Sequence, residues 1–222
     1  MLAGALLGAG LGAAASAVYR TLPEPSNSMW PTLHVGERLI ANRLAGPPER
    51  GAIVVFRYPE HPDQLFVKRI VGLPGDVIAI TNGALSINGR RVPHCVVGTT
   101  SFTEGGATGD SGDKHEGTLA VEWLGRAAHL VFEEQPASGA SRSWTTAPGQ
   151  YFVLGDNRNR SHDSRHWFGG AGGGVPFEGT RGRVRGHDAP AIPRDAEGHA
   201  ALSAALHSCL SKGPPEPPLG PR

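Results

Sequence analysis

The chain has 222 residues, which is enough for one main domain with a sizeable core. Its 21 Lys and Arg residues nearly balance its 20 Asp and Glu residues, so the composition argues against a nucleic-acid-binding protein. With 32 Gly, 19 Pro and only 6% aromatic residues, the chain is typical of many turns and short strands rather than a helix bundle.

The N-terminal segment, Met1 to Val18, carries no charged side chain and is mostly Ala, Gly and Leu. Because a membrane span needs roughly 20 apolar residues, we expect residues 1–20 to form an N-terminal transmembrane anchor. A cleaved secretory signal is the second interpretation, since residues 13–17 are small, but the usual basic region is missing. A buried helix is the third, and the many glycines disfavour it. Since Arg20 follows the segment and no Lys or Arg precedes it, loop charge does not orient it in a membrane.

The sequence from Leu22 to about Gly186 predicts a mostly-β domain, which we place at residues 21–187. Short runs rich in branched or aromatic residues alternate with Gly, Pro and Asn turn signals. No alternation of helices with strands is visible, which disfavours a doubly wound fold. The predicted strands are residues 38–42, 52–56, 65–71, 77–80 and 151–154, and residues 85–92 predict a hairpin closed by Asn88 and Gly89.

A variable insert is expected within this domain at about residues 96–147. Its first part, residues 98–113, is largely Gly, Thr, Ser and Asp and predicts a mobile loop. Residues 122–132 predict one or two strands.

The C-terminal part, residues 188–222, loses the β pattern and predicts a low-complexity tail. One short helix is expected at residues 200–209, and the Pro- and Gly-rich end from Lys212 predicts disorder. Cys95 and Cys209 lie in very different segments and form no disulfide framework, so we expect two free thiols.

Two segments carry the residues with the clearest chemistry. Ser28 lies between Pro25 and Pro31, whose rings restrict the backbone and help to aim a hydroxyl. Lys68 lies inside the apolar run 65–71, where burial favours the neutral amine. A serine needs a base to become a good nucleophile. The two segments therefore predict a serine–lysine dyad, which needs neither histidine nor metal.

The strand that carries Lys68 also predicts where its neighbours point. If side chains alternate, Lys68 and Phe66 share one face of the strand, and Val67 and Arg69 share the other. A solvated lysine on an edge strand is the structural alternative. For Ser28, the structural alternative is a turn serine that caps a backbone group.

A second catalytic arrangement can be built from Ser28, His162 and Asp163. It is weaker, because the side chains of adjacent residues point apart in extended chain. The histidines are scattered without metal-ligand spacing, so we expect no metal and no cofactor.

Three motifs, found in the same order, resemble those of the bacterial type I signal peptidase (leader peptidase) family. They are Ser-Met-Trp-Pro-Thr at residues 28–32, Lys-Arg-Ile-Val-Gly-Leu-Pro-Gly-Asp at residues 68–76, and Gly-Asp-Asn-Arg-Asn-Arg-Ser-His-Asp-Ser-Arg at residues 155–165. The resemblance runs from about residue 25 to residue 186, with a poor match at the insert. It implies a partly open antiparallel β-barrel or coiled sheet behind one N-terminal membrane helix.

The resemblance also implies roles for particular residues. Ser28 corresponds to the nucleophile, and Lys68 to the base that later acts as an acid. The supporting residues it implies are Ser26 in the oxyanion hole, Ser161 orienting the lysine, and Arg69, Asp163 and Arg165 as structural support.

By this resemblance, the chain is expected to be a membrane-bound serine endopeptidase that cleaves N-terminal signal peptides from exported preproteins. Its partners would be those signal peptides, bound extended by strand addition, and the lipid bilayer. It would cross the bacterial cytoplasmic membrane once, with the catalytic domain on the extracytoplasmic face.

The sequence departs from the family pattern at three places. Asn27 replaces the usual glycine between the two serines, and Glu24 stands where an apolar residue usually lines the pocket for small substrate side chains. A glycine-rich stretch, residues 168–174, intervenes before Val175. Two alternatives therefore stay open: a specialised relative that matures pilin or conjugation proteins, and a non-catalytic membrane-tethered β module with an exposed Lys68.

Overall fold

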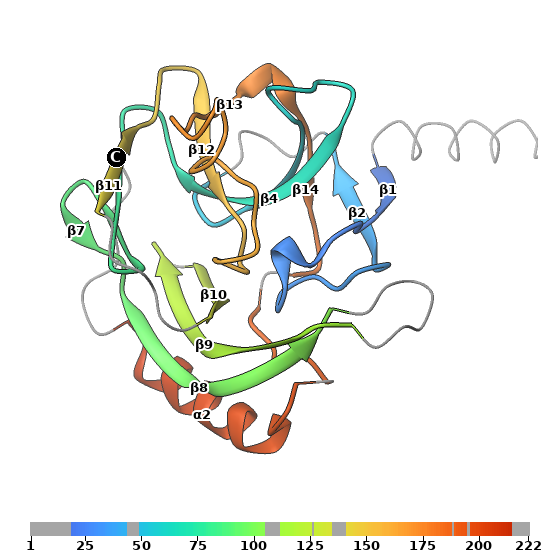
Figure 1. Cartoon of the computed structure of the whole chain (residues 1–222), viewed down its shortest axis with the longest axis vertical. Helices are drawn as coiled ribbons and strands as arrows, with labels where there is room; N and C mark the ends of the chain where they lie inside the picture. Colours follow the sequence, from blue (N-terminus) through green and yellow to red (C-terminus); the bar gives the residue numbers. More distant parts are fainter. Residues whose placement is uncertain are drawn as a thin grey trace, which may run out of the picture.

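The computed structural model describes residues 19–43, 49–104, 112–125, 127–134, 141–187, 189–194 and 196–214. These residues form a mostly-β structure with antiparallel pairing in three sheets (Figure 1). The seven-stranded sheet has the order β1-β2-β14-β3-β4-β12-β13, the three-stranded sheet β10-β9-β8, and the four-stranded sheet β11-β5-β6-β7. The mostly-β class expected from the sequence is confirmed.

The elements follow one another along the chain with these bounds: β1 (Tyr19–Pro23), the 3-10 helix η1 (Asn27–Met29), β2 (Arg38–Asn42), β3 (Ile53–Arg57), β4 (Leu65–Gly72), β5 (Val77–Thr81), β6 (Ala84–Ile87), β7 (Arg90–Arg91), β8 (His94–Thr103), β9 (Lys114–Leu124), β10 (Ala127–Glu134), β11 (Arg142–Thr145), β12 (Gln150–Leu154), β13 (Val175–Pro176), the 3-10 helix η2 (Phe177–Gly179), β14 (Thr180–Val184) and α2 (His199–Lys212).

The strands predicted from short apolar runs are confirmed as β2, β3, β4, β5 and β12. The predicted hairpin is also present, with β6 paired to β7. Asn88 and Gly89 close it with φ angles of 54° and 77°. A two-residue turn of this kind needs positive φ at both positions, which Asn and Gly tolerate best.

The mobile loop expected at residues 98–113 is wrong for its first part. Residues up to Thr103 continue β8, which pairs with β9 along most of its length. The Thr and Ser residues that suggested a loop also suit a strand, because they fit a pleated surface. The strands expected at residues 122–132 are confirmed as the end of β9 and the start of β10, and residues 105–111 lie outside the described part.

The C-terminal tail is folded over part of its length, because α2 packs against β8 (Figure 1). Leu202, Leu206 and Cys209 recur at helical spacing and are buried on one face of α2. At Gly98 a Cβ atom would come within 2.8 Å of Leu202 Cδ2, so the absence of a side chain on β8 lets the helix approach. Residues 215–222, where disorder was expected, lie outside the described part.

The free thiols expected at Cys95 and Cys209 are wrong, because the two residues form a disulfide between β8 and α2. Their Cα atoms lie 6.0 Å apart although 114 positions separate them in sequence. Only the docking of α2 onto β8 brings them together, and the sequence pattern around either cysteine carries no sign of that contact.

Reduction of this disulfide is expected to lower the free energy of unfolding by about 2–5 kcal/mol, because the bond closes a long loop in the unfolded chain. Urea denaturation with and without dithiothreitol measures the change. The Cys95→Ser/Cys209→Ser double variant should match the reduced protein and should not respond to dithiothreitol. Equal midpoints for the oxidised and reduced wild type would show that packing alone holds α2.

The N-terminal anchor was expected at residues 1–20, of which residues 1–18 lie outside the described part. Residues 19 and 20 belong to β1, which pairs with β2 along its full length, so these two residues are strand and not helix. Within the part of the chain that the structure describes, no helix has the length and apolarity of a membrane span.

Candidate active site

The serine-bearing turn is η1, whose first residue follows Ser26. The Ser26 side chain caps η1 by accepting a hydrogen bond from the Ser28 N–H at 3.4 Å. The two residues after Ser28 anchor the turn: Met29 packs among buried side chains under β2, β3 and β4, and Trp30 stacks on Phe102. Because these two buried side chains hold the backbone of η1 in place, the direction in which the Ser28 side chain points is also fixed.

The loop after β12 holds the other side of this turn. Asn157 donates its backbone N–H to the Ser28 carbonyl and its side-chain amide to the Asn27 carbonyl, each at 3.1 Å. A Cβ atom at Gly155 would lie 2.4 Å from the Ser28 carbonyl oxygen, closer than real contacts allow. Glycine at this position therefore lets the β12 loop pack directly behind Ser28.

Lys68 lies in the middle of β4 and is only 4% exposed. Its Nζ lies 2.6 Å from Ser28 Oγ and 2.9 Å from the Val67 carbonyl oxygen. The same Nζ lies 5.4 Å from the centre of the Phe66 ring, as expected if the two side chains share a face. The sequence-predicted pair is thus within hydrogen-bond reach, and a solvated surface lysine is ruled out.

The charge state of Lys68 follows from its surroundings. Burial lowers its pKa, and the carboxylates of Asp163, Glu24 and Asp156 partly oppose that effect. Burial is the largest influence on this pKa, so at a given pH a larger fraction of Lys68 is the neutral amine than for a lysine in water. As an ammonium, Nζ donates to Ser28 Oγ; as an amine, it can accept the serine proton.

Ser26 lies between the nucleophile position and Glu24. Its Oγ lies 3.0 Å from Ser28 Oγ and 3.2 Å from Glu24 Oε1. A hydroxyl has one proton, so Ser26 can donate to one of these acceptors at a time. The resemblance implies that the Ser26 hydroxyl belongs to the oxyanion hole, and the structure places that hydroxyl in contact with Ser28 Oγ.

The third motif supplies a buried ion pair. Asp163 Oδ1 accepts from Arg165 Nε, and Oδ2 from Arg165 Nη2, both at 2.8 Å, while Oδ2 also accepts from the Gly155 N–H at 3.0 Å. Burial alone would raise the pKa of Asp163, but the Arg165 guanidinium and these hydrogen bonds lower it to about 2. The Asp163–Arg165 pair therefore holds the loop after β12 together, including Gly155, which packs directly behind Ser28.

Ser161, expected to orient Lys68, is buried, and no hydrogen bond joins its Oγ to Lys68; its hydroxyl instead helps to lower the pKa of Asp163. The expected contact with Lys68 is therefore not made in this structure. Its hydroxyl lies against Gly155, where a Cβ atom would come within 2.2 Å of it.

Arg69 points away from Lys68, to the other face of β4, as alternation predicts. Its Nε lies 2.8 Å from Asp156 Oδ1 and its Nη2 lies 2.7 Å from Asp156 Oδ2. Thr32, just after the serine turn, also donates to Asp156. Arg69, expected as structural support, thus pairs with Asp156, which joins β4 to the serine-bearing segment.

A second buried charge network was missed by the sequence analysis. Arg158 Nη1 lies 3.0 Å from Glu122 Oε1, and His129 Nε2 lies 3.5 Å from Glu122 Oε2. Burial would raise the pKa of Glu122, but the Arg158 guanidinium lowers it well below its usual range. A glutamate inside the apolar end of β9 was the available signal, because a buried carboxylate needs a cationic partner. This network ties the β9–β10 sheet to the loop that carries the third motif.

The His162 alternative finds no support in the geometry. His162 Nε2 lies 2.8 Å from Tyr58 Oη, and the Asp163 carboxylate is paired with Arg165. Within the described residues, the hydrogen bonds of Ser28 Oγ are to Lys68 and Ser26. The hydroxyl–amine pair present here is therefore Ser28 and Lys68, a combination that suits a nucleophile and a base.

A cavity of about 300 Å³ opens at this pair. It is apolar over most of its surface and has Ser28 and Lys68 in its wall. The remaining lining residues are Glu24, Pro25, Ser26, Leu65, Phe66, Val67, Arg160 and His162.

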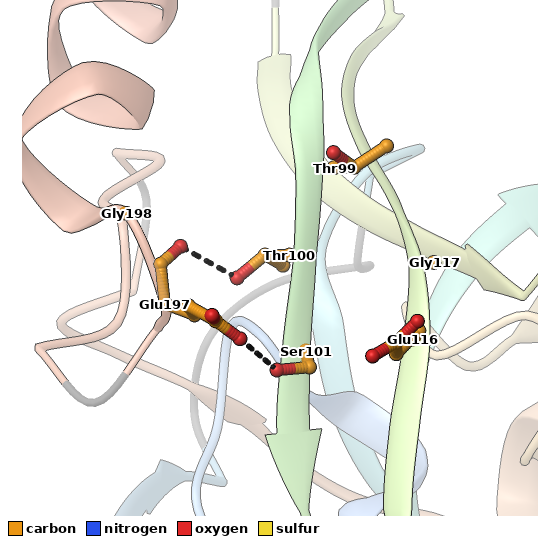
Figure 2. A pocket seen from close by; sticks show the side chains of 7 residues that line it. All are labelled: Thr99, Thr100, Ser101, Glu116, Gly117, Glu197 and Gly198. Carbon is orange, nitrogen blue, oxygen red and sulfur yellow. Dashed lines mark hydrogen bonds between the residues drawn. The ribbon is translucent and has the colours of Figure 1, made fainter.

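A larger hollow of about 620 Å³ lies elsewhere, between β8, β9 and the turn before α2 (Figure 2). Its hydroxyls are engaged in holding that turn: Thr100 Oγ1 donates to the Glu197 carbonyl at 3.0 Å, and Ser101 Oγ to Glu197 Oε2 at 2.8 Å. Among its lining residues there is no side-chain amine beside a hydroxyl. The smaller cavity, which has a lysine amine within hydrogen-bond reach of a serine hydroxyl in its wall, is therefore the candidate active site.

Comparison with known proteins gives consistent matches. The family described as "Signal peptidase, peptidase S26" matches residues 2–187. Signal peptidase I of Pseudomonas aeruginosa is 38% identical over 161 residues, which cover 64% of this chain and 53% of that protein. Signal peptidase I of Bacillus caldolyticus is 37% identical over 155 residues, which cover 68% of this chain and 71% of that protein.

A crystal structure of a signal peptidase I from Enterococcus faecalis is 25% identical, covers 63% of this chain and 97% of that chain, and has a TM-score of 0.35. The chain spans about half the length of the Pseudomonas relatives. The family match nevertheless extends over most of the 222 residues and includes all three motifs. The chain belongs to the signal peptidase family, peptidase S26.

Proposed function

We propose that this chain is a serine endopeptidase that removes N-terminal signal peptides from exported preproteins, with Ser28 as nucleophile and Lys68 as general base. The observation that carries the proposal is the 2.6 Å separation of Lys68 Nζ and Ser28 Oγ at a cavity. Such a pair has the nucleophile and the base that acyl transfer requires. The names of the relatives supply the substrate class, preproteins with signal peptides.

The reaction begins with neutral Lys68. Its amine takes the Ser28 proton while Ser28 Oγ forms a bond to the scissile carbonyl carbon, giving a tetrahedral oxyanion. The Ser28 N–H is held only by a 3.4 Å contact with Ser26, and the Ser26 hydroxyl can turn, so both can donate to that oxyanion. Each such donor is worth about 3 kcal/mol of transition-state stabilisation.

Collapse of the intermediate breaks the carbon–nitrogen bond, and the Lys68 ammonium gives its proton to the leaving amine. A water molecule then attacks the acyl carbonyl carbon while neutral Lys68 accepts a proton from the water. The bond between that carbon and Ser28 Oγ breaks, and Lys68 returns the proton to Oγ, which regenerates Ser28. Ser161, buried against Gly155 behind the serine turn, helps to hold the loop that backs Ser28 during these steps.

The β4 edge beside the dyad suits an extended substrate. β12 pairs with β4 only through Arg69, Ile70 and Gly72, whereas β3 pairs with β4 from Leu65 to Arg69. Within the described residues, the Leu65–Lys68 half of β4 therefore has a strand partner on one side only. A peptide added at that edge would lie along the cavity wall, with its carbonyl near Ser28.

The proposal includes a location on the extracytoplasmic face of the membrane. The disulfide between Cys95 and Cys209 supports an oxidising compartment, where such bonds persist. The apolar residues 1–18 would provide a single-pass anchor beside that domain.

Cleavage of a preprotein in detergent tests the proposal. Wild type should release the mature chain, and Ser28→Ala should lower the rate by about 10³-fold or more, because no other group can form the acyl-enzyme. Ser143→Ala, at an exposed position on β11, is the matched control and should retain wild-type activity. Equal cleavage by Ser28→Ala and wild type would rule out the serine mechanism.

A further inference from the structure

Glu24 is the least expected residue in the active-site cavity. It is 2% exposed, and its backbone is fixed because its N–H donates to the Glu37 carbonyl and its own carbonyl accepts from the Gly36 N–H. Its side chain is also partly held, since Oε1 accepts from the Ser26 N–H at 3.2 Å and lies 3.2 Å from Ser26 Oγ, which can donate to it when it does not donate to Ser28. The carboxyl group is thus placed at the cavity wall with little freedom to move.

The second oxygen of this group, Oε2, is buried and makes no hydrogen bond with any described residue. A buried polar atom without a partner is costly, and most such atoms are paired. Because Glu24 lines the cavity that contains Ser28 and Lys68, a group entering that cavity can satisfy Oε2.

We propose that Glu24 determines substrate specificity by hydrogen-bonding, through Oε2, a serine or threonine side chain at one of the alternate substrate positions just before the scissile bond. The inference rests on the proposed function, because it concerns the residues that the Ser28–Lys68 site accepts. It predicts that a hydroxyl is preferred where the cavity's apolar lining alone would favour alanine or valine.

The size of the cavity and its remaining lining favour a hydroxyl. The cavity is small, about 300 Å³, and mostly apolar, so a long cationic side chain would lose its hydration there. A hydroxyl both donates and accepts, so it can pair with Oε2 whether the Glu24 carboxyl is ionised or protonated. A substrate on the free edge of β4 presents alternate side chains to the same side, which limits the contact to alternate positions.

The test uses preprotein peptides that differ only by the isosteric pair threonine and valine, or by serine and alanine, at the first or third position before the cut. For wild type, kcat/KM should favour the hydroxyl peptide by about tenfold at one of these positions. Glu24→Leu should abolish or reverse that ratio, and Glu24→Gln, which keeps an acceptor oxygen, should retain part of it. Glu37→Gln removes a nearby carboxylate that does not line the cavity and should leave the ratio unchanged.

Because the kcat/KM values of two peptides are compared within one enzyme, any effect of Glu24 on Ser26 or Lys68 cancels in their ratio. A fall in both rates with an unchanged ratio would overturn the inference and leave Glu24 with a positioning role through Ser26. A further peptide with lysine at the same position tests the cationic alternative. A higher kcat/KM for that peptide than for the threonine peptide would overturn the inference as well. If wild type cut no peptide faster than Ser28→Ala, the proposed function would fail, and the inference would fail with it.

Discussion

Replacing Lys68 with arginine is expected to lower kcat for preprotein cleavage by about 10³-fold or more, while the protein stays folded. Arginine keeps the positive charge and much of the length, but its guanidinium does not deprotonate in a protein. It therefore cannot take the proton of Ser28 Oγ, which Lys68 Nζ approaches at 2.6 Å. Lys212→Arg makes the same change at an exposed position near the end of α2 and should leave kcat unchanged.

The pH profile of the wild type checks the same assignment independently. Because burial lowers the pKa of Lys68, kcat/KM should rise with pH as the ammonium loses its proton, with a midpoint below 10.5, the ordinary lysine value. Near-wild-type cleavage by Lys68→Arg would show that another group is the base. His162, the remaining titratable imidazole at the cavity, would then be the first to examine.

The parts of the site that the sequence predicted are those determined by local pattern. An apolar run around Lys68 and prolines around Ser28 predicted a buried amine and a fixed hydroxyl, and the family resemblance supported their pairing across the intervening chain. Strand alternation also placed Phe66 on the same face as Lys68 and Arg69 on the opposite face, where it contacts Asp156. Period-two geometry is a property of the strand itself, so it needs no tertiary information.

The features that the sequence did not predict depend on contacts between segments that are distant along the chain. The partner of Cys95 is 114 positions away on a helix whose docking depends on packing against β8, at the close approach to Gly98. The partner of Arg69 is likewise not readable from the sequence, because Asp156 and Asp163 lie close together and only the path of the loop decides which carboxylate reaches β4.

The role of the glycine-rich stretch, residues 168–174, also depends on a contact with a distant segment. Comparison with the family pattern marked residues 168–174 only as a glycine-rich stretch that intervenes before Val175. In the structure, Trp144 Nε1 donates to the Ala171 carbonyl at 3.0 Å, and a Cβ atom at Gly172 would collide with that indole. The glycines allow the stretch to pack against β11, a role that depends on a tryptophan nearly thirty positions earlier and not on the stretch itself.

Replacing Asp163 with asparagine is expected to change both stability and the activity of Lys68. The buried Asp163 carboxylate accepts a two-point contact from Arg165, which asparagine cannot reproduce, so the free energy of unfolding should fall by roughly 3 kcal/mol. The folded-state pKa of Asp163 is about 2, below the ordinary value of 3.8. Its contribution is therefore present above about pH 4 and is lost as the pH falls toward 2, so the difference from wild type should shrink in acid.

The effect on Lys68 separates a role in catalysis from a role in folding alone. Among the charged groups that influence Lys68, the Asp163 carboxylate is the one that most raises its pKa, against the larger effect of burial. Removing that charge should lower the pKa of Lys68 further and move the acid limb of kcat/KM to lower pH.

Asp63→Asn, at an exposed position, is the matched control and should change neither quantity. A lower stability with an unmoved acid limb would show that Asp163 supports the loop without acting on the base. An unfolding midpoint equal to that of the control would show instead that the Arg165 pair contributes nothing to the fold.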